Sequence, residues 1–152
     1  MTPAPLAPAR RRSILLIASA GSFLIAALHV AIPVMGPSWY RYFGAPSLAV
    51  EVERGSAFRP AAMTLTFAAI FALWGLYALA ATGHTRRPPF LRPALIAIGL
   101  VYVLRGLFIV PQLLVLAAGR TQPIHMLVFS AVSFVLGLCY LEGARTAWAA
   151  LS

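Results

Sequence analysis

Residues 13 to 32 read SILLIASAGSFLIAALHVAI, a run of twenty residues without a formal charge. A helix of about 20 residues is about 30 Å long, which matches the hydrocarbon thickness of a bilayer. Three further apolar windows follow, at about 61–82, 93–118 and 123–141. The sequence therefore predicts an all-α integral membrane protein, a four-helix transmembrane bundle.

The composition supports this fold class. Of the 152 residues, 61% are hydrophobic and 10% are charged, whereas soluble domains carry about 25% charged residues. The four windows leave no stretch for a separate soluble domain. We expect one transmembrane domain over 13–152, preceded by a disordered, Pro/Ala-rich N-terminus over 1–12.

The net charge of +9 comes from arginine, because the chain has no lysine. Arginines at positions 10–12 precede the first span, and those at 86, 87 and 92 lie between the second and third. The positive-inside rule places both groups, and hence both termini, on the cytoplasmic side of a bacterial inner membrane. Because the bilayer accounts for these charges, we expect it as the partner and expect no nucleic acid. The single cysteine, Cys139, excludes a relay between paired thiols.

The loop between the first two spans contains an aromatic stretch, MGPSWYRYFGAP at 35–46, of the kind that favours the headgroup region. The segment that follows predicts a short interfacial helix with Ser47 as N-cap and Gly55 at its end. Glu51 and Arg54 would share one face of this helix.

A charge interrupts the third window, which reads LVYVLRGLFIV over 100–110. Arg105 follows Arg92 by thirteen residues, which places it about 20 Å into a core of about 30 Å, in the outer half. His29 and His125 are predicted at similar depth on the first and fourth spans. Tyr102 and Gln112 share the helical face of Arg105. These positions predict an outer-leaflet polar pocket.

The candidate ligand-binding residues lie in this pocket or in the loop above it: Arg105, His29, Tyr102, His125, Glu51, Glu53 and Gln112. Arg105 has a structural alternative, pairing with Glu51 or Glu53. The alternative for His29 is a hydrogen bond between helices, and for His125 a place at the interface. No metal site is expected.

Five sequence features in this order, His29, WYRYFGAP, FALWGLYALAATG, LRP and YVLRG, resemble small four-span bacterial inner-membrane proteins of a family without an assigned chemistry. The resemblance extends over most of the chain after residue 13. It implies the four-helix fold and supplies no catalytic residue.

Three function classes remain. The first is a binding or assembly protein whose pocket holds a lipid headgroup, a quinone or a small anion, with a homo-oligomer or a larger membrane complex as possible assemblies. The second is an intramembrane enzyme on a lipid-like substrate, with His29 or His125 as acid/base and Arg105 stabilising negative charge. The third is a b-type haem protein with both histidines as axial ligands. Binding or assembly is the preferred reading, and the cofactor is unknown.

Overall fold

The computed structural model describes residues 7–86 and 88–146, with side chains from residue 12 onward, and every regular element in this part of the chain is a helix. In order, the helices are α1 (Ala7–Met35), α2 (Pro37–Tyr42), α3 (Pro46–Glu53), α4 (Phe58–Ala81), α5 (Leu91–Gly106), α6 (Ile109–Ala117) and α7 (Ile124–Thr146). Four segments are long and apolar enough to cross a membrane: Arg12–Met35, Phe58–Ala81, Leu91–Ala117 and Ile124–Thr146. The all-α, multi-pass membrane fold is thereby confirmed.

Two of the spans differ in length from the expectation. Helix α1 begins at Ala7, so residues 7–12 are helical where a disordered segment was expected; residues 1–6 lie outside the described part. Helix α7 continues to Thr146, five residues past the expected end, because Glu142 pairs with Arg145 at i+3 and Thr146 bonds the Glu142 carbonyl. Polar contacts within the helix therefore extend it beyond its apolar window.

The chain divides into two compact units. Unit 1 consists of Met1–Gly21 and Trp74–Ser152, and unit 2 of Ser22–Leu73. Each is described by itself below, and the prediction of a single domain over 13–152 stays a prediction.

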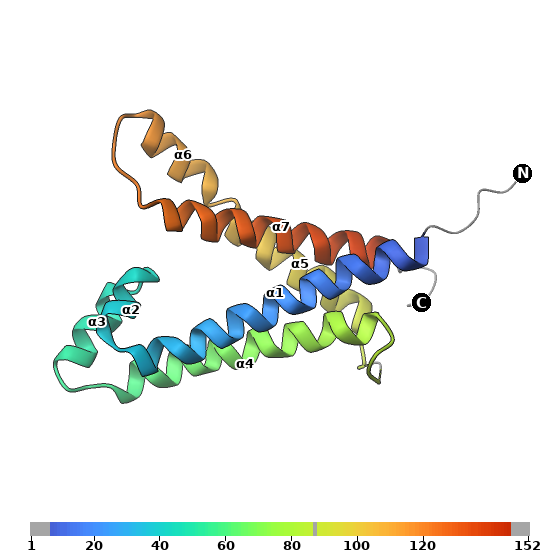
Figure 1. Ribbon diagram of the computed structural model, residues 1–152, viewed down its shortest axis with the longest axis horizontal. Coiled ribbons are helices and arrows are strands. Elements are labelled where there is room, and N and C mark those ends of the chain that lie inside the picture. The colour runs from blue at the N-terminus through green and yellow to red at the C-terminus, as the bar shows by residue number, and fades with distance from the viewer. Residues whose placement is uncertain (1–6, 87, 147–152) are drawn as a thin grey trace, which may run out of the picture. The chain divides into compact units, whose positions relative to one another are not determined.

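In unit 1, α5 and α7 lie side by side (Figure 1) and approach through glycines. A Cβ added at Gly106 would lie 2.5 Å from the Cα of Phe134, and one at Gly137 would lie 2.6 Å from the backbone N of Val103. Both distances are shorter than any real carbon contact, so the two backbones touch where they could not with larger residues. This crossing fixes the third and fourth spans against each other.

Hydrogen bonds from two helices reach successive carbonyls of α4. The hydroxyl of Ser19 on α1 donates to the Gly75 carbonyl at 2.9 Å, and the hydroxyl of Tyr140 on α7 donates to the Trp74 carbonyl at 2.9 Å. Tyr140 is fully buried. A buried hydroxyl needs such a partner in an apolar interior, so these bonds hold α1, α4 and α7 together.

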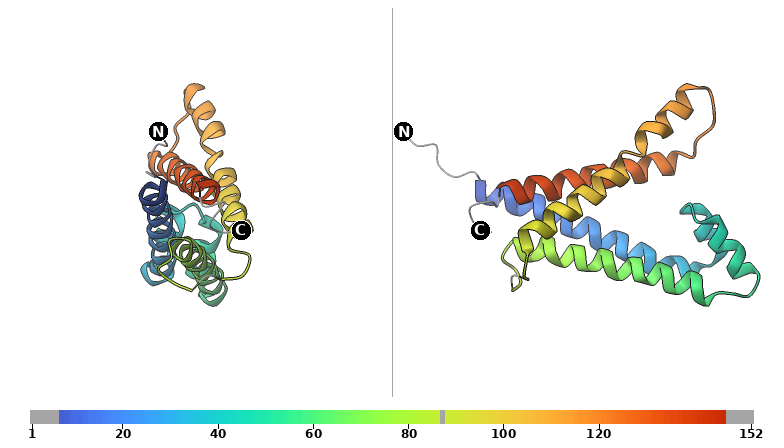
Figure 2. Two further views of the ribbon diagram at one scale, coloured as in Figure 1. Left: turned by 90° about the vertical axis from the view of Figure 1, so that its right-hand side faces the viewer. Right: turned by 180° about the vertical axis from the view of Figure 1, so that it is seen from behind.

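The third span is broken between α5 and α6, as Figure 2 shows. The break lies one turn before Pro111. A proline ring clashes with the carbonyl four residues earlier, which here belongs to Leu107. That carbonyl instead accepts a hydrogen bond from Val110 at 3.0 Å, three residues ahead, which tightens the turn.

Unit 2 contains the loop helices α2 and α3. Helix α3 begins at Pro46 with Ala45 as N-cap, so the prediction of Ser47 as N-cap is wrong, because proline at the first helical position already has the required φ. Gly55 does follow the end of α3, with φ of 85°. Helix α2 was not predicted. A cluster of Ile32, Tyr40 and Ala49 joins both helices to the end of α1, and Leu48 and Val52 pack against it.

Candidate functional site around Arg105

Arg105 lies in the last turn of α5, immediately before the break in the third span. Its Nη1 donates a hydrogen bond to the hydroxyl of Ser130 on α7 at 3.2 Å. Its guanidinium carbon lies 5.8 Å from the centre of the Phe108 ring, within the range of a cation–π contact. Ser130 is fully buried, whereas Arg105 itself is exposed on the surface of unit 1. The guanidinium is thus anchored on one side and accessible on the other.

The acidic residues of the chain are all committed to other arginines. The sequence contains three carboxylates. Glu51 bonds Arg59, Glu53 bonds Arg41 at 2.6 Å, and Glu142 bonds Arg145 at 2.8 Å. Glu51 and Glu53 form their ion pairs within unit 2, and the structural alternative in which one of them pairs with Arg105 stays a prediction. The charge of Arg105 is met by a neutral hydroxyl and an aromatic ring.

Gln112 lies on α6, seven residues after Arg105 and beyond the break in the third span. Its Oε1 atom is buried and has no hydrogen-bond partner among the described residues. A buried amide oxygen without a donor costs free energy. The third span thus carries a guanidinium without a carboxylate partner in unit 1 before its break and a buried amide oxygen without a donor after it.

The surface around Arg105 is apolar. Leu104, Phe108 and Val110 are 63%, 60% and 51% exposed. In a membrane span such exposed side chains face lipid chains. The guanidinium therefore lies among exposed apolar side chains of unit 1.

Tyr102 shares the buried side of α5 and belongs to the core of unit 1. It is 3% exposed, stacks on Tyr140 with ring centres 5.7 Å apart, and meets Trp74 edge-on at 5.1 Å. These ring contacts describe Tyr102 as a packing residue, whereas Arg105, predicted on the same helical face, is exposed.

The two membrane histidines lie in different units. His125, one residue into α7, is half-buried, and its ring centre lies 5.6 Å from that of Phe129. His29, in unit 2, donates from Nδ1 to the Ile25 carbonyl one turn earlier at 2.8 Å, and its ring packs against Phe71 at 4.9 Å. The hydrogen bond of His29 is therefore within its helix rather than between helices. That His29 and His125 share a pocket with Arg105 stays a prediction.

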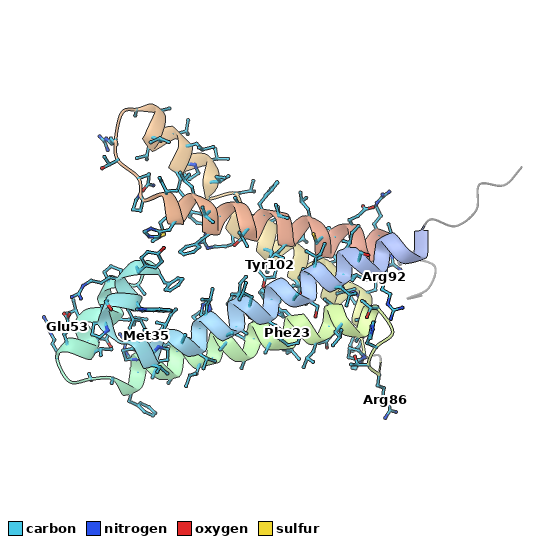
Figure 3. The ribbon with its side chains drawn as sticks, in the orientation of Figure 1. Phe23, Met35, Glu53, Arg86, Arg92 and Tyr102 are labelled. Carbon is cyan, nitrogen blue, oxygen red and sulfur yellow. The ribbon has the colours of Figure 1, made fainter. Side chains whose placement is uncertain are left out.

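Glu51 and Glu53 form part of the polar surface of unit 2, where Figure 3 labels Glu53 on α3. The hydrogen bonds from Arg59 lower the pKa of the Glu51 carboxyl, and the hydrogen bond from Arg41 lowers the pKa of the Glu53 carboxyl. The partner of Glu51 is Arg59, eight residues on, and not Arg54, because the chain turns back after Gly55.

Ser130 was missed by the sequence analysis. It begins a stripe on α7 whose members recur every three or four residues and are all buried: Ser130, Ser133, Gly137, Tyr140 and Ala144. This spacing of small and polar residues is a readable signal for a tightly packed helix face. It marks a buried face of α7 and does not show which helix packs against it.

Among the described residues, no group of three or more His, Cys, Asp or Glu side chains could hold a metal ion. Comparison with known proteins found no family model, no curated sequence and no solved structure that matches this chain.

Proposed function

We propose that this chain is a binding protein of the bacterial inner membrane, with both termini cytoplasmic, whose outer-leaflet site around Arg105 holds the headgroup of a phospholipid. One observation carries the proposal: all three carboxylates of the chain bond other arginines. The counter-charge of Arg105 therefore comes from outside the chain.

The chemistry of the site favours a phosphate. A guanidinium offers parallel N–H donors that fit two oxygens of a phosphate, a geometry that lysine lacks. Nη1 of Arg105 donates to the Ser130 hydroxyl, and this bond orients the remaining N–H groups of the guanidinium. The unpartnered Oε1 of Gln112 favours a headgroup that also brings a hydroxyl or ammonium donor, such as phosphatidylglycerol or phosphatidylethanolamine.

The apolar surroundings favour a lipid over a soluble anion or a quinone. The exposed side chains beside Arg105, Leu104 and Phe108, match acyl chains. A soluble anion would have to cross this apolar surface, and a quinone would bring no negative charge. The intramembrane enzyme and the haem protein stay predictions, since no contact of His29 or His125 favours either.

Native mass spectrometry of protein extracted in a mild neutral detergent tests the proposal. The wild type should retain phospholipid. Arg105→Gln should reduce its occupancy about tenfold, as expected for the loss of one charge-assisted hydrogen bond of about 1.5–3 kcal/mol. Arg105→Lys should reduce the phospholipid occupancy by an intermediate amount, because lysine keeps the charge and lacks the parallel N–H donors of the guanidinium.

Arg54→Gln is the matched control, since it removes an exposed arginine from unit 2. It should leave the retained lipid unchanged. Equal phospholipid occupancy in the wild type and Arg105→Gln would refute the proposal, as would a wild type that carries quinone in place of phospholipid.

A further inference from the structure

A second concentration of positive charge lies at the other end of the third span, around the loop between α4 and α5. Figure 3 labels two of its arginines, Arg86 in the loop and Arg92 near the start of α5. Arg12 of α1 joins them, because its Nη2 lies 2.9 Å from Nε2 of His84 in the same loop. His84 is exposed, so solvent reaches it.

The hydrogen bonds around His84 determine which of its nitrogens carries the proton. A guanidinium has only donors, so Nε2 accepts from Arg12. The Thr82 hydroxyl donates its one proton to the Leu79 carbonyl at 2.6 Å and can therefore only accept from Nδ1 of His84, which lies 2.6 Å away. In this arrangement Nδ1–H of His84 donates to the Thr82 hydroxyl, and Nε2 accepts from the Arg12 guanidinium.

This arrangement cannot persist when His84 gains a second proton. Nε2 would stop accepting, and two cations would lie 2.9 Å apart. An anionic oxygen placed between Arg12 and the imidazolium would replace this repulsion by attraction, because both cations would donate hydrogen bonds to it. A bound phosphate and a proton on His84 therefore favour each other.

The surrounding charges add to the attraction for an anion. Arg86 follows His84 by two residues, and Arg92 begins the next span. At the same end of α7, Glu142 receives two hydrogen bonds from Arg145, at 2.8 and 2.9 Å. Leu15 of α1 packs at Gly143, which places this pair beside the first helix. The end of unit 1 therefore carries an excess of positive charge.

We propose that Arg12 and His84 bind the phosphate of an anionic phospholipid, and that binding takes up one proton from solvent onto Nε2 of His84. A lipid is the chosen source because the site lies just outside the ends of the first two spans, at the level of the headgroups. A basic surface made of arginine alone would bind such lipids equally at every pH near neutrality. A pH dependence of lipid binding that requires His84 therefore distinguishes a specific site from general electrostatic attraction to arginines.

The experiment measures the thermal stabilisation of the purified full chain by short-chain phosphatidylglycerol in a neutral maltoside detergent, at pH 8 and pH 6. The apparent affinity should be about fivefold tighter at pH 6, at the low end of typical coupling between two ligands. His84→Gln keeps a neutral acceptor and a donor but takes up no proton, so its affinity should be the same at both pH values. Arg12→Gln should weaken binding at both.

Arg54→Gln is the control, because it removes an exposed arginine of unit 2 that belongs to neither site, and it should leave the pH effect intact. Lipid bound at Arg105 is separated from this site by the comparison with His84→Gln, which leaves Arg105 unchanged. Equal wild-type affinity at both pH values, or a pH effect that survives in His84→Gln, would overturn the proposal. Competition by glycerol 3-phosphate as strong as that by the lipid would overturn the assignment to a lipid.

Discussion

Replacing Arg105 by leucine should leave the protein as stable as the wild type or more stable, once bound lipid has been removed. Arginine at the centre of a span costs about 2.5–3.5 kcal/mol on insertion scales. The structure offsets this by one hydrogen bond to Ser130, at 3.2 Å and thus long for its kind. A charged hydrogen bond contributes about 1.5–3 kcal/mol. The difference, about 0–2 kcal/mol, favours leucine.

The assay is equilibrium unfolding of delipidated protein in mixed micelles, for Arg105→Leu, Ser130→Ala and the double variant. The cycle should give a coupling energy of about 1.5–3 kcal/mol between the two side chains. Breaking a buried ion pair instead costs about 3–5 kcal/mol, since the partner charge is stranded. A loss of that size in Arg105→Leu would refute the reasoning and reveal a counter-charge within the protein.

Three further outcomes follow from the structure. Gly106→Ala should lower the free energy of unfolding by about 1–3 kcal/mol, because the added Cβ would clash with the backbone of Phe134. Gly21→Ala should cost less, because its Cβ would meet only the side chain of Leu136, which can rotate. Equal losses of stability in thermal unfolding would contradict this prediction. Since the folded pKa values of Glu51 and Glu53 are lowered, their ion pairs stabilise the protein above the unfolded pKa of about 4.3 and are lost as pH falls through the folded values. The double Gln variant should therefore lose less stability than the wild type between pH 6 and pH 3, measured by thermal unfolding. A reporter fused after Gly83 should be cytoplasmic and one between α2 and α3 external; the reverse would overturn the orientation.

The helices of the fold were predictable because their signals are local. Length and apolarity alone identify four spans, and Gly55 marks the end of α3 through its backbone freedom. The start of α3 was misread because Pro46 and Ser47 are both good starting residues, and only the fold shows which one is used. The extra turn of α7 depends on Glu142 and Arg145, whose pairing forms only once the helix exists.

The candidate site was predictable in its central residue and not in its partners. Arg105 is conspicuous in an apolar run, and the inward side of its helix follows from periodicity, as Tyr102 shows. The partner of Arg105, however, depends on which helix lies beside α5. Glycines at the crossing, such as Gly106, bring α7 there. Ser130 could be recognised as the acceptor only after that neighbour was known.

The break in the third span and the position of Arg105 reinforce each other. Pro111 disrupts the helix at Leu107, so α5 ends one residue after the arginine. The negative end of the α5 dipole then faces the guanidinium, a contribution of about 0.3–1 kcal/mol. Together with the bond to Ser130 this roughly equals the insertion cost, so arginine is tolerated at this position. It is not favoured, because leucine would reach the same stability without either contact. Stability alone therefore does not account for Arg105, which is the reason for proposing a phosphate that uses its remaining donors.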